Sequence, residues 1–274
     1  MNNGILYMAT GDKYINETKR SVTSLRNHMP DIPVTLVTDQ DVKHEGIDDV
    51  IIKDDFNYDY RDSITNIEDT PYERTLQLDS DTYICGEFHE IFDVLDEFDL
   101  GISVNPGKTH FERGDNTYVS DSVPKGFPVF NSGVMLFRNN IRVRSLFEKW
   151  RRIYADTIED NPRKYNQPAL WEALYTSDVR LFPLPREYNC FILFSGCVSH
   201  EVKIIHGRHP EQERIAKEMN EFTGPRCYDK SKYPIRITRG RFPGNERIDY
   251  RIRKSVGENG IKETVKMGLK RLFG

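Results

Sequence analysis

The first forty residues predict a strand, a helix and a second strand, and this unit limits the fold more than any other part of the chain. Residues 5–9 and 34–38 are apolar and β-prone, and residues 14–28 carry Tyr14, Thr18, Val22 and Leu25 at helical spacing. A connection of this kind is right-handed and places two parallel strands side by side. The sequence therefore predicts an α/β fold with a mostly parallel central sheet flanked by helices.

Polar residues follow both strands of this unit. Ligands of open parallel sheets bind at the edge formed by the carboxyl ends of the strands, so we expect a ligand near Thr10, Asp12, Tyr14 and Asp39. The alternative is that Asp12 and Asp39 only cap a helix and a turn. No G-x-G-x-x-G pattern follows the first strand, which argues against a dinucleotide cofactor.

An acidic pair ends a later apolar run, LQLDSDTYI at residues 76–84. Residues i and i+2 of an extended segment point to the same side, so Asp79 and Asp81 can aim at one point. That point suits a divalent cation, although two aspartates in a turn need no function. A cation held by two carboxylates needs further ligands, and substrate phosphates commonly supply them.

His206 is the residue that we add to this pair as a metal ligand. It follows the apolar strand predicted at residues 202–205, and a neutral imidazole is a good ligand for Mn²⁺ beside oxygen donors. The competing interpretation is a structural or solvent-facing histidine, and it applies equally to His89, His200 and His209.

The rest of the chain continues the alternation of strands and helices. Residues 105–127 are polar and glycine-rich without periodicity, and loops of that length are usually functional lids or disordered. Further strands are predicted at residues 50–53, 100–104, 129–139, 179–184 and 191–194, and helices at residues 60–69 (weakly), 88–98, 141–158, 166–174 and 211–222.

The last forty residues differ from the rest in charge. Residues 236–274 hold 11 Lys or Arg against 4 acids, whereas the whole chain has a net charge of -4. We expect a domain at residues 1–222 and a basic C-terminal extension at 223–274, ending in an amphipathic helix at 261–273. Such a helix suits an anionic membrane surface; alternatively it packs on its own domain or a partner subunit, or is solvated. Nucleic acid is disfavoured, since the basic residues lack interleaved aromatics and the main body is acidic.

The composition excludes several other classes of protein. The chain has 274 residues, 37% apolar and 30% charged, as in soluble globular proteins, and its longest apolar run is too short to cross a bilayer. The first residues lack the cationic start of a signal peptide. We expect a cytoplasmic location, peripheral on the inner membrane face if the tail binds lipid. The four cysteines show neither a C-x-x-C pair nor zinc-ligand spacing, so we expect them to be reduced.

The order of five segments resembles the GT-A glycosyltransferases, particularly those similar to glycosyltransferase family 8. The segments are LQLDSDTYI, an amphipathic helix, FNSGVMLFRNN, NQPALWEAL and IIHGR, and the resemblance covers roughly residues 5–209. It implies a Rossmann-like nucleotide-sugar-binding sheet and retaining transfer from a nucleoside diphosphate sugar, with UDP-sugar the expected donor. Mn²⁺ or Mg²⁺ would be the cofactor, and a glycan or lipid-linked sugar the acceptor.

The resemblance also implies roles for individual residues. Asp79, Asp81 and His206 would hold the metal. Asn131 and Gly133 match the family's N-[ST]-G turn near the sugar. Residues expected to bind the donor are Thr10, Asp12, Tyr14, Asp39, Arg61, Ser80, Gly133, Gly207 and Arg208, and those expected in catalysis are Asn131, Asn166 and Gln167.

One residue departs from the family pattern. The helix that usually begins with Asp-Gln reads Asn166-Gln167 here, and an amide can hydrogen-bond to a sugar hydroxyl but brings no charge. Catalysis would depend mainly on stabilising the departing diphosphate by the metal with Arg61 or Arg208. A general base is needed only for inversion, and Asp115 and Asp121 of the long loop are the candidates.

Two other functions compete with this interpretation. Phosphohydrolases with the pattern D-x-D-x-[TV] also place paired aspartates after a strand, but here Tyr83 occupies the fifth position and Thr82 comes one place early. The second alternative is a degenerate transferase that binds a partner or a glycan without catalysis. Asn166, which stands where the family usually has Asp, keeps this alternative open.

Overall fold

The computed structural model describes residues 2–107, 110, 111, 120–159, 164–232 and 235–239, together with residues 256, 261, 263, 265 and 266. Its contacts divide the chain into two units, residues 1–237 and residues 238–274. Of the described residues in the second unit, 238 and 239 belong to a strand, and 256, 261, 263, 265 and 266 are helical. The helical residues cover only four positions of the amphipathic helix expected at 261–273; its other positions lie outside the described residues.

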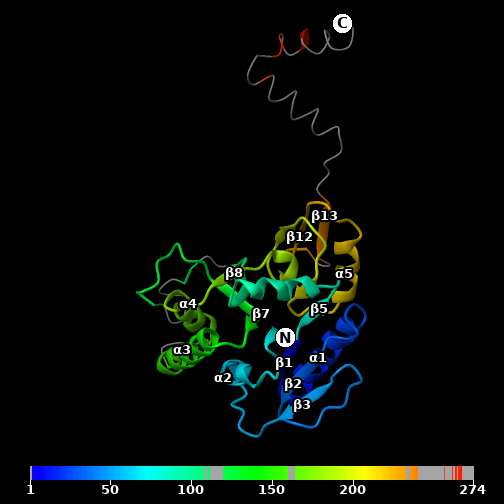
Figure 1. Ribbon diagram of the computed structural model, residues 1–274. Coiled ribbons are helices and arrows are strands. Elements are labelled where there is room, and N and C mark those ends of the chain that lie inside the picture. The colour runs from blue at the N-terminus through cyan, green and yellow to red at the C-terminus, as the bar shows by residue number, and fades with distance from the viewer. Residues whose placement is uncertain are drawn as a thin grey trace. The chain divides into compact units, whose positions relative to one another are not determined.

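A seven-stranded sheet forms the centre of the first unit, in the order β3-β2-β1-β4-β7-β6-β8 (Figure 1). Pairing is parallel between β1 and β2, β1 and β4, β2 and β3, and β6 and β8, which confirms the mostly parallel sheet. β7 runs antiparallel to both of its neighbours. The strands are β1 Asn3–Met8, β2 Val34–Thr38, β3 Asp49–Ile52, β4 Arg74–Leu78, β6 Leu100–Val104, β7 Phe130–Arg138 and β8 Leu181–Pro183.

Helices cover both faces of this sheet, because each presents one apolar stripe to it. The helix α1 (Gly11–Arg26) and the 3-10 helix η2 (His89–Asp96) pack in one core cluster. The helices α3 (Ile141–Thr157) and α4 (Gln167–Tyr175) pack in another, with Ile64 of α2 (Tyr60–Thr65) and Ile67 of the 3-10 helix η1 (Ile67–Asp69). The segment predicted at 88–98 is thus a 3-10 rather than an α-helix, yet it buries the expected apolar face.

The structure also contains two small three-stranded sheets. One contains β5 (Thr82–Ile84), β11 (Ile204–His206) and β9 (Cys190–Phe191). The other contains β10 (Gly196–Val198), β12 (Arg226–Asp229) and β13 (Arg236–Arg239). The 3-10 helix η3 (Arg186–Tyr188) precedes β9, and α5 (Gln212–Asn220) follows β11. The antiparallel β5–β11 pair sets His206 opposite Thr82, next to the acidic motif.

A disulfide joins Cys197 to Cys227, which face each other across the β10–β12 pair. The expectation that all four cysteines are reduced is therefore wrong for this pair, while Cys85 and Cys190 are free. A separation of 30 residues matches no cysteine motif, and only the strand register brings the two thiols together. The bond also ties residues beyond the expected boundary at 222 to the body of the unit. Among the described residues, no helix is long and apolar enough to cross a membrane.

Candidate metal and donor-binding site

The three expected metal ligands meet at the carboxyl end of β4. Nε2 of His206 lies 3.6 Å from Oδ2 of Asp79 and 3.4 Å from Oδ1 of Asp81. Each residue offers one donor atom, and the three atoms lie within 4.8 Å of one another. Within the described part of the chain, no other group of His, Cys, Asp and Glu side chains meets this criterion. Two carboxylates and an imidazole are donors suited to Mn²⁺.

Backbone contacts from distant parts of the chain hold this acidic turn in place. The Asp79 N–H donates to the Gly133 carbonyl at 2.8 Å, and the Gly207 N–H donates to the Asp81 carbonyl at 3.2 Å. Nε2 of Gln212 donates to the carbonyls of both Asp81 and Gly207, at 2.8 and 2.9 Å. Residues of β7 and α5 and the glycine after β11 therefore help to position the acidic turn that follows β4.

A chain of two asparagines orients His206. Nδ1 of His206 lies 3.0 Å from Oδ1 of Asn189, and Nδ2 of Asn189 donates to Oδ1 of Asn131 at 3.0 Å. A carboxamide oxygen only accepts hydrogen bonds, so Nδ1 carries the proton and Nε2 faces the carboxylates. Metal-binding histidines are commonly oriented by such a partner on the far ring nitrogen. Asn189 was not among the predicted residues, because no motif in the sequence marks it.

Gly133 leaves room for the imidazole. A Cβ at this position would lie 2.1 Å from Cε1 of His206 and 2.8 Å from Oδ2 of Asp79. The N-S-G segment is not the turn that the sequence suggested; it lies within β7, where the pairing with β6 shifts register between Ile102 and Ser103. The close approach of the metal ligands explains why a glycine occupies this strand position.

The environment of His206 and Asp81 shifts the pKa values of both groups. Burial lowers the pKa of His206, but Asp79 and Asp81 outweigh that effect and raise it to about 9. Burial raises the pKa of Asp81, but His206 and Arg208 outweigh it and the pKa is lowered. The imidazolium therefore pairs with the two carboxylates when no cation binds there.

Arg208 lies beside the acidic pair, over the ring of Tyr14. Its Nη1 is 3.6 Å from Oδ2 of Asp81, and its guanidinium carbon is 5.1 Å from the centre of the Tyr14 ring. Nε donates to Oε1 of Glu17 at 2.9 Å, and the Ser80 hydroxyl donates to Oε2 of Glu17 at 3.0 Å. The structure thus brings Tyr14, Ser80 and Arg208 together, all of them predicted, and Ser80 and Arg208 share Glu17, a residue that was not predicted.

The remaining predicted residues of the first strand and helix lie at the same edge of the sheet. Thr10 is the N-cap residue of α1, and the Gly11 N–H donates to Oδ1 of Asp39 at 3.1 Å. Nε2 of Gln40 donates to Oδ1 of Asp12 at 3.2 Å. Asp39 therefore accepts a hydrogen bond at the start of α1, which is the capping role considered as the alternative in the sequence analysis. Binding of the donor by Thr10, Asp12 and Asp39 stays a prediction.

Arg61 is not brought to the metal ligands. Its guanidinium forms an ion pair with Asp59 at 2.7 Å, and its role at the donor phosphates stays a prediction. The preceding residue, Tyr60, lies closer: burial raises its pKa, and Tyr165, Tyr14 and Asp79 raise it further. The rings of Tyr60 and Tyr165 meet edge to face at 5.7 Å. These two half-exposed tyrosines were missed, because isolated aromatics carry no signal in one sequence.

The start of α4 contains the predicted catalytic pair. Asn166 is buried as the N-cap residue; its Nδ2 donates to the Ser63 hydroxyl at 3.2 Å, and its carbonyl accepts from the Trp150 indole. Oε1 of Gln167 lies 3.5 Å from Nδ2 of Asn105. Neither side chain contacts the metal ligands, so their catalytic roles stay predictions. Asp121 is exposed, and Asp115 lies outside the described residues.

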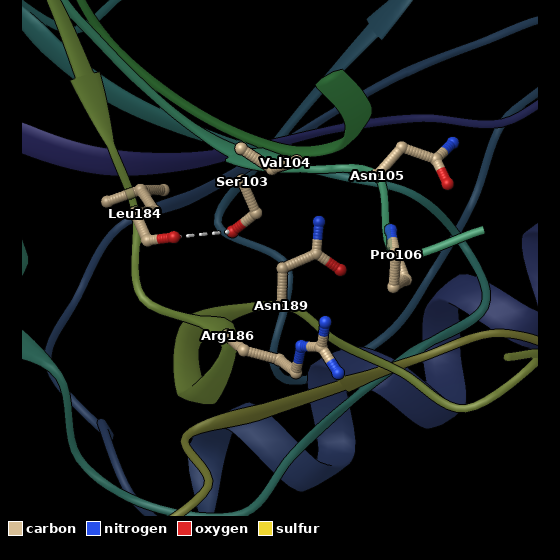
Figure 2. A pocket seen from close by; sticks show the side chains of 7 residues that line it. All are labelled: Ser103, Val104, Asn105, Pro106, Leu184, Arg186 and Asn189. Atoms are coloured by element: carbon tan, nitrogen blue, oxygen red, sulfur yellow. Dashed lines mark hydrogen bonds between the residues drawn. The ribbon is translucent and has the colours of Figure 1, made fainter. Parts of the chain in front are cut away.

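A cavity of about 270 Å³ is lined by Asn189, the residue that contacts His206. Asn189 forms part of its wall (Figure 2). The side-chain oxygen of Asn189 lies 3.0 Å from Nδ1 of His206. Asn105, which bonds to Gln167, forms another part. The cavity therefore lies between the metal ligands and the start of α4, and its lining is Ser103, Val104, Asn105, Pro106, Leu184, Arg186 and Asn189.

No known family model and no curated protein matches the chain. Solved structures do match. A galactosyltransferase LgtC, in complex with donor and acceptor sugar analogues, aligns with a TM-score of 0.53 and 13% identity over 80% of this chain and 95% of its own. The glycosyltransferase GlyE of Streptococcus pneumoniae TIGR4 aligns with a TM-score of 0.56 and 17% identity over 81% of this chain and 61% of its own.

A third match is the bifunctional glycosyltransferase WbbM, with a TM-score of 0.51 and 14% identity over 70% of this chain and 40% of its own. These identities are too low to carry residue roles, but the alignments span most of the chain. Together with the mostly parallel sheet, they show that this chain has the GT-A fold of these glycosyltransferases, as the sequence motifs predicted.

Proposed function

We propose that this protein is a metal-dependent glycosyltransferase that moves a hexose from a nucleoside diphosphate sugar to a glycan or lipid-linked acceptor. The observation that carries the proposal is the meeting of Asp79, Asp81 and His206 at the carboxyl edge of a GT-A sheet. That edge is where open α/β sheets bind their ligands. The similar structures supply the reaction class, since their names describe glycosyltransferases.

The three side chains fit a divalent cation, Mn²⁺ or Mg²⁺. Nε2 of His206 faces the two carboxylates, and the missing side chain of Gly133 leaves the space that the imidazole needs. When bound, the cation would neutralise charge on the diphosphate as the glycosyl bond breaks. The protein's part is to hold these ligands in one orientation, which Asn189 and Gln212 support.

Residues around the cation would bind the rest of the donor. Arg208 is a cation beside the metal ligands, and a guanidinium suits a phosphate oxygen. Tyr14 offers a half-exposed ring to the nucleobase, and Ser80 a hydroxyl. Three further parts of this proposal follow from the family resemblance. The nucleotide is UDP. Residues that also bind the donor are Thr10, Asp12, Asp39, Arg61 and Gly207, and those that act at the sugar are Asn131, Asn166 and Gln167.

Retention of stereochemistry is proposed on the same resemblance. An inverting transferase deprotonates its acceptor with a carboxylate. The polar side chains that line the cavity containing Asn189 are two amides, a serine and an arginine, which hold and orient hydroxyl groups without removing protons.

A screen of nucleotide sugars tests the proposal. Binding of UDP-glucose, UDP-galactose and their GDP counterparts is measured by calorimetry with and without Mn²⁺, on the protein and on Asp81→Ala. We expect Mn²⁺-dependent binding that Asp81→Ala abolishes and that the exposed-site control Asp31→Ala keeps. Metal-dependent binding that survives Asp81→Ala would refute the metal assignment.

The same preparation separates the two competing functions. Release of phosphate from simple monoesters, without nucleotide sugar, would favour a phosphohydrolase. Binding of UDP-sugar with Mn²⁺ but no transfer to any glycan or to water would favour a degenerate transferase that only binds.

We also propose that the basic extension attaches the protein to anionic membranes. Ile261 and Val265 are exposed apolar residues of its helical part, 70% and 55% accessible, and Lys266 lies beside them in sequence. Helices with this division of apolar and basic residues bind anionic surfaces. Deleting residues 262–274 should abolish cosedimentation with phosphatidylserine vesicles and leave nucleotide binding intact; unchanged cosedimentation would overturn the idea.

A further inference from the structure

The cavity beside the metal ligands contains one charged side chain, Arg186. Its other lining groups are two amides, one serine hydroxyl that already bonds to the Leu184 carbonyl at 3.2 Å, and apolar atoms. Figure 2 shows Arg186 and Asn189 beside each other, facing the segment from Ser103 to Pro106. Arg186 therefore sets the charge of this cavity.

The guanidinium of Arg186 is held in place by residues behind it. A Cβ on Gly196 would lie 2.1 Å from Nη1 of Arg186 and 2.8 Å from the Tyr228 hydroxyl, so the guanidinium lies against a strand that has no side chain there. Burial raises the pKa of Tyr228, and the hydrogen bond from Arg186 opposes that rise. The arginine is thus fixed by contact with Gly196 and Tyr228, rather than extended into solvent.

Arg186 nevertheless has no acidic partner. No ion pair within the described part of the chain includes it. By contrast, Arg208 pairs with Glu17, and Arg61 pairs with Asp59. An arginine that is positioned by its surroundings and faces a cavity without a carboxylate is suited to an anionic group of a ligand, which it can bind through two parallel N–H bonds.

The position of the cavity indicates which ligand would carry the anionic group. Asn189 separates the cavity from His206, and Asn105 links it to Gln167, so a group inside it lies next to the expected site of sugar transfer. We propose that this cavity binds a sugar that carries a carboxylate or phosphate, with Arg186 as the residue that selects the anionic group. This inference rests on the proposed function for the identity of the ligand as a sugar.

Two sources of the anionic sugar can be distinguished by binding measurements. If the donor carries it, UDP-glucuronate should bind more tightly than UDP-glucose in the presence of Mn²⁺. If the acceptor carries it, methyl glucuronide or glucose 6-phosphate should bind more tightly than methyl glucoside to protein saturated with UDP and Mn²⁺. In either case the preference should be ~10-fold or more, as expected for a charge-assisted bidentate contact.

Substitution of Arg186 provides the decisive comparison. Arg186→Met should remove the preference for the anionic sugar, and Arg186→Lys should keep part of it, because the charge remains without the bidentate geometry. Arg152→Met, at an exposed position of α3, is the matched control and should keep the full preference. Binding of UDP with Mn²⁺ should be the same in all three variants.

Failure of this inference is distinct from failure of the proposed function. If UDP binds with Mn²⁺ but neither anionic probe is preferred, or if the preference survives Arg186→Met, the inference is wrong and the proposed function stands. If UDP does not bind at all while methyl glucuronide binds through Arg186, the proposed function is wrong and the anionic cavity stands.

Discussion

The side-chain oxygen of Asn189 lies 3.0 Å from Nδ1 of His206, on the side of the ring away from the acidic pair. This contact fixes which ring nitrogen faces Asp79 and Asp81, and losing such a contact typically weakens metal binding ~10- to 100-fold. We therefore expect Asn189→Ala to weaken Mn²⁺ binding by that factor in a calorimetric titration. Asn27→Ala, at an exposed position, should leave the affinity unchanged. Equal affinities in the two variants would show that His206 is not oriented by Asn189.

Gly133→Ala should disrupt the same ligand from the opposite side. The added Cβ would lie 2.1 Å from Cε1 of His206, and this buried ring has little space to move. Overpacking of this kind costs ~1–3 kcal/mol of unfolding free energy, so the variant should still fold in urea titrations while Mn²⁺ binding is lost.

The control for that variant is Gly126→Ala, where a Cβ would meet no atom within 4 Å. It should match the unchanged protein in both stability and Mn²⁺ affinity. If Gly133→Ala binds Mn²⁺ as tightly as Gly126→Ala does, then His206 is not confined as described or is not a ligand.

Asp99 should make the free energy of unfolding depend on pH in the acidic range. Burial raises the pKa of this carboxyl, but hydrogen bonds from the Arg180 backbone and side chain and from Asn140 outweigh burial and lower the pKa to about 2. In the unfolded chain the value is about 3.9, so the stabilisation is fully present above about pH 4 and is lost as the pH falls towards 2.

Asp99→Asn measures this contribution. At pH 7 we expect it to lower the free energy of unfolding by ~1–3 kcal/mol, because Arg180 and Asn140 lose a charged acceptor. The difference from the unchanged protein should shrink below pH 4, as followed by urea unfolding at several pH values. Asp93→Asn, at an exposed position of η2, should show no such difference; a difference for Asp99→Asn that stays constant with pH would contradict the assignment.

The disulfide between Cys197 and Cys227 should stabilise the first unit without affecting metal binding. A bond that closes a loop of 30 residues contributes ~2–4 kcal/mol, chiefly by restricting the unfolded chain. The double variant Cys197→Ser and Cys227→Ser should therefore unfold at lower temperature but bind Mn²⁺ equally well. Thiol titration of the denatured, unreduced protein should detect only Cys85 and Cys190, and four reactive thiols would refute the bond.

The fold and the three residues of the candidate metal site could be predicted from the sequence, because each has a local signal. Apolar runs separated by an amphipathic helix predicted the parallel strands, and Asp79 and Asp81 stand directly after one of those runs. His206 was found in the same way, at the end of a short apolar strand. In all three cases the strand end itself places the side chain at the sheet edge.

The missed features depend on pairing between distant segments, which has no local signal. The direction of β7 and its register shift decide that Gly133 approaches His206, so the N-S-G segment was misread as a turn. Asn189 and Arg186 act through neighbours that are far away in sequence. Arg61 is a different case, because its ion-pair partner Asp59 lies only two residues before it, and its role at the donor phosphates stays a prediction.

The pairing of β5 with β11 has a consequence for how the protein is made. Asp81 acquires its partners Gly207 and Gln212 only across this pair, and Gln212 is 131 residues further along the chain. Contacts of such long range form slowly, because a long loop must close first. A nascent chain that ends before β11 thus contains the acidic motif without the pocket that would hold a cation. During synthesis, a nascent chain should therefore retain Mn²⁺ only after β11 has paired with β5.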